Sequence, residues 1–178
     1  MPFLIFYGKL SVSQHFIVEP LLDKSIKELL NQFQPKFTQK TSIMIGLQVL
    51  ERLQTLHERG YLHLDLKLEN LMIPISRDKS LIYLIDFGIS KPFLDHKGVH
   101  IKKRSNVPFT GNILFASKNL FVNREQSRRD DLISLVYLVL YFLNGGMSWL
   151  GKLRNGSQQQ YFAKVGHWKN TKTTQQLC

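Results

Sequence analysis

The sequence predicts an α+β fold in which helices predominate and the strands are few and short. An apolar helical spacing extends over 39–58, long enough for a helix of several turns. Two pairs of short apolar runs, 3–7 with 15–19 and 71–75 with 81–85, are each separated by turn-forming residues, which is typical of β-hairpins. The 178 residues suffice for one sizeable core, and two full domains are not expected.

The composition excludes several classes of protein. With 43% apolar residues, the chain is too apolar for a disordered tail. Its single cysteine, Cys178, rules out an internal disulfide. Because secreted proteins commonly rely on disulfides, we expect a reducing compartment, the cytoplasm or the nucleus.

The first elements along the chain are short. The strands 3–7 and 15–19 should pair, with Gly8–Ser13 as the turn region. Pro20–Asp23 interrupts the strand pattern, and Ser25–Phe33 has a short helical period. The opening segment therefore predicts a hairpin, a break and a short helix, in that order.

The long helix expected over 39–58 has boundary signals at both ends. Thr38 is a suitable N-cap, and Gly60 follows the last helical residue. The apolar positions form one helical stripe: Ile43, Leu47, Leu50, Leu53 and Leu56. Residues 61–70 show no clean period, so an irregular segment is expected there.

The second hairpin is centred on Asp78 if its two apolar runs pair symmetrically. Leu71 then faces Ile85, and extending this register by one step places Asn70 opposite Asp86. An amide oxygen and a carboxylate would then meet at the open end of the hairpin. Oxygens of this kind are the ligands that Mg²⁺ uses, together with water and phosphate.

The second half of the chain begins with a long irregular basic stretch at 90–120. Leu132–Leu143 is apolar at every position except Ser134, which predicts a helix buried on all sides. These twelve residues fall short of the roughly 20 needed to cross a bilayer, so no transmembrane segment is expected. Gly145 and Gly146 should end this helix, and a region rich in Gly, Gln and Lys closes the chain.

Positive charge is concentrated in this second half. Residues 1–89 contain ten Lys or Arg and nine Asp or Glu, whereas residues 90–178 contain fourteen and four, giving the net charge of +11. A basic half attracts nucleic acid, anionic membrane or acidic protein segments. Nucleic acid is not expected, because the sequence has neither the aromatic residues of an RNA-binding strand motif nor a zinc-ligand spacing.

The irregular segment 61–70 carries the clearest chemical signal. Asp65 and Lys67 would place a proton acceptor beside an ammonium group that can bind phosphate. Taken singly, such residues are more often loop residues that make local caps and surface ion pairs. Their combination is more specific, because the sequence reads H-x-D-x-K-x-x-N from His63 and then D-F-G from Asp86.

These two motifs resemble the catalytic core of eukaryotic-type protein kinases. The resemblance implies that Asp65 accepts the proton of the substrate hydroxyl and that Lys67 contacts the transferred phosphoryl group. Asn70 and Asp86 would hold Mg²⁺, and ATP would be the phosphoryl donor. His63 would have an architectural role.

Further residues narrow the resemblance to the casein kinase I family of Ser/Thr protein kinases. The residues that carry this likeness are E-Q-S-R-R-D-D-L at Glu125–Leu132, Thr110-Gly111, Ala116-Ser117, Trp149-Leu150-Gly151 and Tyr161. Asp131 matches the family position that braces the catalytic loop from the central helix. An acid at the start of a helix is also favoured by the helix dipole, which is the purely structural interpretation.

The resemblance implies a partial kinase domain. Residues 1–18 would be strands of the small lobe, 19–23 the hinge, and 24–178 a large lobe shortened at its C-terminal end. A monomer is expected.

The same resemblance assigns the nucleotide site. Glu19 and Leu21 would hold adenine by backbone hydrogen bonds, and Pro20, which lacks an N–H group, falls between these two bonding positions. Met72 would form the apolar floor under the adenine. Ordinary core packing is an equally good interpretation of Met72.

Members of this family prefer acidic or already phosphorylated protein substrates. Arg104 and Gly151 match family positions that bind such anions, and Lys102 and Lys103 add charge beside Arg104. A further lysine of that anion site is Gln160 here. A solvated basic face is the alternative interpretation.

Several residues of a working kinase are missing from this sequence. No G-x-G occurs, so the glycine-rich phosphate loop is absent, and Lys9, the only lysine before the hinge, has no helix after it to provide a glutamate partner. Leu64 and Leu68 replace the usual Arg and Pro of the catalytic loop. We therefore expect little or no kinase activity from the chain alone, with a non-catalytic docking module for acidic proteins as the alternative function.

Overall fold

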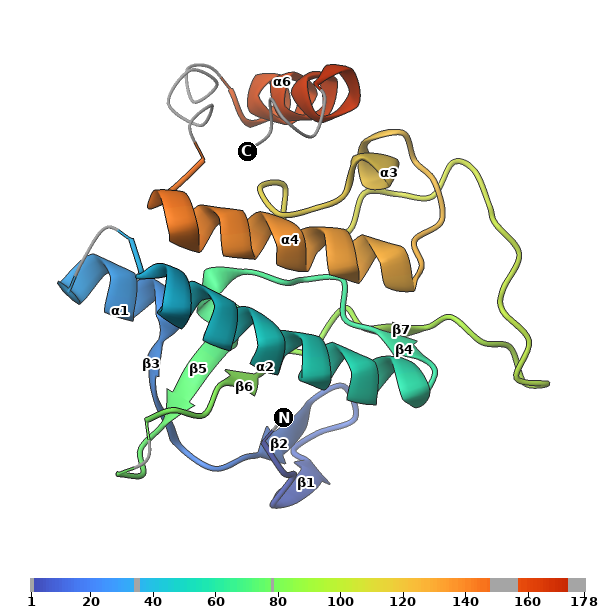
Figure 1. Cartoon of the computed structure of the whole chain (residues 1–178). Helices are drawn as coiled ribbons and strands as arrows, with labels where there is room; N and C mark the ends of the chain where they lie inside the picture. Colours follow the sequence, from blue (N-terminus) through green and yellow to red (C-terminus); the bar gives the residue numbers. More distant parts are fainter. Residues whose placement is uncertain (1, 34–35, 78, 148–156, 173–178) are drawn as a thin grey trace.

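The computed structural model describes residues 2–33, 36–77, 79–147 and 157–172. Two long helices, α2 (Gln39–Glu58) and α4 (Arg128–Asn144), pack against each other through the middle of the protein. The first strands of the chain lie on the α2 side of this pair, and helix α6 (Gln158–Thr171) lies on the α4 side (Figure 1). The predicted α+β fold is confirmed.

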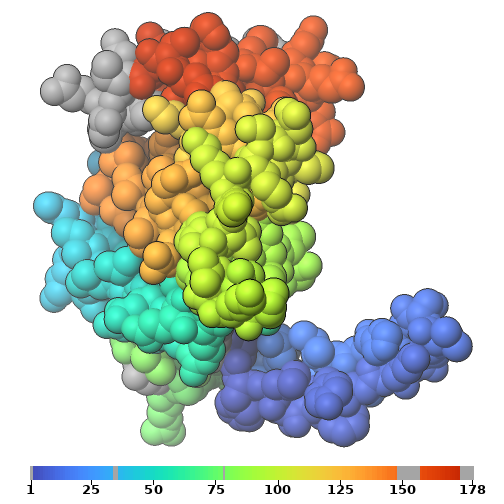
Figure 2. Space-filling model, turned by 90° about the vertical axis from the view of Figure 1, so that its right-hand side faces the viewer, coloured from blue at the N-terminus to red at the C-terminus, as the bar shows by residue number. Residues whose placement is uncertain are grey.

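The first two strands form a separate hairpin. Strand β1 (Phe6–Lys9) pairs antiparallel with β2 (His15–Val18), as the sequence predicts, although β1 starts three residues later and continues through Gly8 and Lys9. The turn is therefore shorter than expected and is closed by the bond from Leu10 N to Gln14 O, 2.9 Å. Figure 2 shows this blue segment extending away from the rest of the protein, and its apolar side chains are largely exposed.

A three-stranded sheet follows, with the order β3 (Leu22–Ser25), β5 (Leu71–Pro74) and β6 (Tyr83–Leu84). Strand β3 is absent from the sequence prediction, which placed a break at 20–23. Leu22 and Ser25 instead pair with Pro74 and Met72. Because the partner strand β5 lies about fifty residues further along the chain, the local sequence pattern does not predict β3.

The predicted register of the second hairpin is wrong by one residue. Leu71 pairs with Leu84 and Met72 with Tyr83, and the Ile85 N–H donates to Asn70 O at 3.0 Å. Asn70 is thus opposite Ile85 rather than Asp86. The observed pairs are centred between positions 77 and 78 rather than on Asp78, which lies outside the described residues. The turn sets the register of a hairpin, and the two apolar runs do not specify that turn.

Helix α1 (Ile26–Phe33) and helix α2 lie close to their predicted positions. The Thr38 hydroxyl accepts a hydrogen bond from Thr41 N at 3.1 Å, so this residue caps α2 as expected. After the helix, Gly60 adopts φ +80°, a left-handed conformation that glycine permits, and its N–H donates to His57 O.

The core-facing side of α2 differs from the predicted stripe. Leu53 and Leu56 are buried, but Ile43, Leu47 and Leu50 are exposed. The residues of α2 that are buried are Ser42, Ile45, Gly46, Val49, Leu53 and Leu56. The first half of the helix is apolar on more than one side, so its sequence alone does not indicate which side meets α4.

Helix α4 is not buried on all sides, and that prediction is wrong. Leu135, Tyr137, Leu138 and Phe142 are buried, whereas Leu132 and Val136 are exposed. The beginning of the helix is fixed by a capping box between Ser127 and Asp130. Its end is at Gly145, with φ +69°, as the sequence predicts.

The basic stretch at 90–120 is mostly irregular, as expected, with two short regular pieces. Strand β7 (Lys91–Pro92) pairs with β4 (Tyr61–Leu62), and helix α3 (Lys118–Phe121) lies at the end of the stretch. Helix α6 was not predicted. Its amphipathic period is weak, and its position depends on contacts with α3. In the described part of the chain, no helix has the length and apolar character needed to span a membrane.

The packing of α4 can be tested with one substitution at two positions. Leu138 is 0% exposed and Leu132 is 39% exposed on the same helix. We predict that Leu138→Ala lowers the free energy of unfolding by about 2–5 kcal/mol, because it leaves a cavity in the core. Leu132→Ala should cost less than about 1 kcal/mol. Chemical denaturation of both variants measures the difference, and equal losses would contradict the assigned core.

Candidate active site

The segment between β4 and β5 brings three of the predicted site residues together. The Lys67 ammonium donates to Asp65 Oδ2. The Asn70 amide nitrogen donates to the Asp65 carbonyl at 2.9 Å and to Asp65 Oδ2 at 3.2 Å. Asn70 belongs to a short 3₁₀ turn (Leu68–Asn70), which folds its side chain back toward Asp65.

Asp86 joins this cluster from the end of β6. Its carboxylate lies 3.9 Å from the Lys67 ammonium, between Oδ2 and Nζ, and its side chain is half exposed. Asp86 has φ +65°, a left-handed conformation that is unusual for a non-glycine residue. Burial alone would lower the pKa of Lys67, but its bond to Asp65 and the charges of Asp65, Asp86 and Glu69 raise that pKa, so Lys67 is a cation at neutral pH.

The oxygens of Asn70 and Asp86 are of the kind that Mg²⁺ binds, and their role as metal ligands stays a prediction. The Asn70 amide nitrogen donates to Asp65, which identifies the other amide atom as the oxygen. That oxygen makes no hydrogen bond to any described residue. From the described residues, the Asp86 carboxylate receives a weak hydrogen bond from Gly88 N, at 3.3 Å to Oδ1. One amide oxygen and one accessible carboxylate leave room for water and phosphate oxygens, which is the ligand set that Mg²⁺ favours.

Asp131 of α4 holds the beginning of residues 63–70, the segment between β4 and β5 that carries the motif from His63 and that we call the catalytic segment. Its two carboxylate oxygens accept the N–H groups of His63 and Leu64, each at 2.9 Å. Asp131 Oδ2 is also 2.9 Å from His57 Nε2 on α2. Leu64 has φ +72°, a strained conformation for a bulky residue. The buried carboxylate therefore stabilises a backbone geometry that the local sequence disfavours.

His63 is buried and connects Asp65 to the D-F-G segment. Its Nδ1 accepts the Asp65 N–H at 3.3 Å, so its Nε2 carries the proton and donates to Ile85 O at 3.1 Å. Burial lowers the pKa of His63, which keeps the ring neutral in this tautomer. Phe87 packs edge-on against the ring, with 5.2 Å between centroids. This arrangement agrees with the architectural role expected for His63.

Gly111 lies directly against the catalytic segment. It has φ +120°, and a Cβ atom added there would come within 2.4 Å of the Leu64 carbonyl oxygen. Only glycine allows this approach, which brings the loop around Thr110 beside the strained Leu64. Thr110-Gly111 is part of the resemblance to the casein kinase I family, but the sequence alone does not predict this contact with Leu64.

Comparison with known families decides what these motifs belong to. The family model of the protein kinase domain matches residues 5–177. The chain belongs to the protein kinase family. Kinase function in general follows, with protein substrates and the use of ATP and a divalent metal.

The proposed nucleotide contacts of this kinase domain lie at the border between the hairpin and the sheet. Glu19 and Leu21 are exposed residues between β2 and β3, and Leu22 already belongs to β3. Met72 is half buried on β5, between Ser25 and Tyr83. Lys9 is exposed at the end of β1, opposite His15. The adenine contacts and the role of Met72 stay predictions.

The predicted anion-binding Arg104 contacts an acid. Its Nε donates to Glu125 Oε2 at 2.6 Å, and the Lys91 ammonium donates to Glu125 Oε1 at 2.6 Å. Burial alone would raise the pKa of Glu125, but its bonds to Arg104 and Lys91 lower that pKa and keep the carboxylate ionised. The Arg104 side chain is still largely exposed. Gly151 lies outside the described residues.

A buried lysine on α6, which the sequence did not single out, holds the loop before α3. The Lys169 ammonium donates to three carbonyl oxygens, those of Ile113, Leu114 and Ala116, at 3.3, 2.7 and 2.5 Å. It also lies 4.3 Å from the centre of the Tyr137 ring. The loop that approaches the catalytic segment at Gly111 is thus fastened to α6.

Replacement of Asp131 tests how the catalytic segment is held. We predict that Asp131→Asn lowers the free energy of unfolding by about 3 kcal/mol, because the amide cannot accept both backbone N–H groups and leaves one buried donor unpaired. Asp95→Asn is the control, since Asp95 also accepts two backbone bonds but in an exposed turn. Urea denaturation compares the two losses, and equal small losses would contradict the assigned brace.

Lys169 predicts a specific pH dependence of stability. Burial lowers its pKa in the folded protein from 10.5 to about 7. Between these values the unfolded chain binds more protons, so the contribution of Lys169 to folding becomes more favourable as pH rises from 7 toward 10.5.

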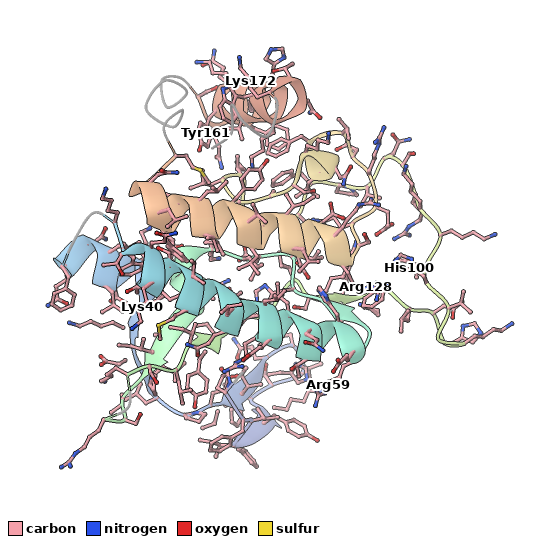
Figure 3. The ribbon with its side chains drawn as sticks, viewed as in Figure 1. Lys40, Arg59, His100, Arg128, Tyr161 and Lys172 are labelled. Carbon is pink, nitrogen blue, oxygen red and sulfur yellow. The ribbon has the colours of Figure 1, made fainter. Side chains whose placement is uncertain are left out.

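The difference in melting temperature between the wild type and Lys169→Met should therefore increase from pH 7 to pH 9.5 in favour of the wild type. Below pH 7 it should stay nearly constant. Lys172→Met, at the exposed end of the same helix (Figure 3), should show no such trend. A pH-independent difference for Lys169→Met would show that the lysine keeps its ordinary pKa.

Proposed function

We propose that this kinase domain is of the casein kinase I type and transfers the γ-phosphoryl group of ATP to Ser or Thr of acidic protein substrates. The observation that carries the proposal is the cluster of Asp65, Lys67, Asn70 and Asp86, whose members are joined by the contacts described above. The E-Q-S-R-R-D-D segment before α4 supports the narrower family. It supplies Glu125 to Arg104 and Asp131 to the catalytic segment.

The residues of the cluster divide the work of phosphoryl transfer. Asp65 accepts the proton of the substrate hydroxyl, and Lys67 provides positive charge at the transferred phosphoryl group. Mg²⁺, when bound, neutralises charge on the phosphate oxygens. Asn70 and Asp86 would hold that ion, and Asn70 also orients Asp65 by bonding both its carbonyl and its carboxylate.

The same sequence predicts weak catalysis by the chain alone. It contains no G-x-G, and its Lys9 is exposed at the end of β1, opposite His15. Phosphoryl transfer depends mainly on positioning and charge stabilisation, so the loss of both phosphate-holding elements should be severe. We propose that the nucleotide is bound weakly and that turnover is small.

Acidic or phosphorylated substrates fit the charge of the loop 90–104. Lys102 and Lys103 are exposed beside Arg104, and the bond to Glu125 fixes the direction of the Arg104 side chain. In Figure 3, His100 and Arg128 mark the two sides of this basic region, on the loop and at the start of α4. Such a surface attracts acidic segments, with the strength falling as salt rises.

Nucleotide binding is the decisive test. We predict that millimolar ATP with Mg²⁺ raises the melting temperature of the chain, as expected from mass action. The shift should disappear with EDTA and in the variant Asp86→Asn, while Asp65→Asn should retain it because Asp65 acts on the substrate hydroxyl. Phosphorylation of casein should be barely detectable.

Two outcomes would change the proposal. Strong, metal-dependent phosphorylation of casein that is abolished by Asp65→Asn would overturn the predicted impairment. No thermal shift at millimolar ATP would favour the alternative function, in which the basic face docks acidic proteins without catalysis.

A further inference from the structure

We propose that α2 and β6 form a second anion-binding site, separate from the active site and from Arg104, that accepts a phosphoryl group. The site is a surface cavity of about 410 Å³. The residues that line it are Arg52, Thr55, Arg59, Leu81, Ile82 and Tyr83. Two arginines, a threonine and a tyrosine thus line one depression, and no Asp or Glu is among the described residues that line it.

The helix geometry places the two arginines on the same side of α2. Arg59 is the C-cap residue that directly follows α2, and it lies seven residues, or about two helical turns, after Arg52, with Thr55 between them. In Figure 3, Arg59 projects from the end of α2 on the side opposite α4. The strand β6, with Tyr83, closes the other side of the cavity.

The charge of these arginines is poorly compensated. The Arg52 side chain is only 25% exposed, and its ion pair is with the adjacent Glu51, at 3.3 Å, whose side chain is 67% exposed and points into solvent. Arg59 Nη1 donates to the Thr55 carbonyl at 3.1 Å, which is a neutral partner. Arg104 is different, because its acid is buried Glu125. Most of the N–H groups of Arg52 and Arg59 therefore remain available to a ligand.

Tyr83 and the apolar residues define the kind of ligand. Among the described residues, none forms a hydrogen bond with the Tyr83 hydroxyl, although the residue is half buried. A phosphoryl group offers three acceptor oxygens, which match two guanidinium forks and one phenol. The cavity is larger than a phosphate ion, and Leu81 with Ile82 provides apolar wall for the rest of a phosphorylated side chain.

The test is a titration of the full chain with inorganic phosphate, followed by NMR signals of the arginine Nε–H groups. We expect the signals of Arg52 and Arg59 to shift, and the double variant Arg52→Gln/Arg59→Gln to weaken phosphate binding by about tenfold or more. The control Lys40→Gln/Lys97→Gln removes the same two charges from exposed positions. It should change the affinity by no more than about twofold, because distant exposed charges are screened.

Tyr83→Phe tests the phenol without altering the charge. It should weaken phosphate binding severalfold while leaving the melting temperature close to that of the wild type. If the arginine double variant proves unstable, Arg52→Lys/Arg59→Lys replaces it. This variant keeps both charges and should still weaken binding, because an ammonium group cannot bind phosphate in the bidentate manner of arginine.

A second titration distinguishes the two sources of a phosphoryl group. A phosphoserine peptide that binds at least about tenfold more tightly than phosphate would identify a phosphorylated side chain as the ligand, and equal affinities would identify the free anion. Both results support the site if the arginine variants abolish them. The proposal would be overturned if Arg52→Gln/Arg59→Gln and the control Lys40→Gln/Lys97→Gln lost the same affinity for phosphate, or if neither lost any. Kinase activity does not enter these measurements, so failure of the proposed function leaves them interpretable.

Discussion

The structure depends on the buried carboxylate of Asp131. It accepts three hydrogen bonds, two from the backbone of the catalytic segment and one shared with His57 of α2. One acid at the start of α4 thereby ties together the two central helices and the residues before Asp65. These bonds help to hold the left-handed conformation of Leu64, which is strained for a bulky residue. The chain turns there just before Asp65, whose partner Lys67 lies 3.9 Å from Asp86.

Other buried polar groups also connect separate segments of the chain, further from the active site. Glu125 connects β7, through Lys91, to Arg104 in the basic loop. Asp130 accepts bonds from Ser117 and Asn119, which fixes α3 to the start of α4. Lys169 fastens the loop before α3 to α6. A buried charge is costly unless its partners are in place, so each of these groups favours one arrangement of loops that have little regular structure.

The side chains that we propose for catalysis lie together between β4 and the D-F-G segment. The groups that we propose to act on the hydroxyl and the metal are held by the large, well-packed part of the protein. The given sequence contains no glycine-rich phosphate loop. The apolar side chains of the hairpin β1–β2 are largely exposed to solvent. Because positioning supplies most of the rate of phosphoryl transfer, intact catalytic residues alone do not ensure turnover.

The sequence by itself determined the protein family, the motif residues, the two long helices and both hairpins, because these depend on residue type and short-range spacing. It did not determine the register of β5 and β6, the strand β3, or which side of α2 is buried at Ile43, Leu47 and Leu50. Those features depend on contacts between residues far apart in the chain. The pairing of Arg104 with Glu125, the burial of Lys169 and the cavity at Arg52 and Arg59 have the same origin. Only the tertiary structure decides which charges are compensated, because compensation requires two groups that folding brings together.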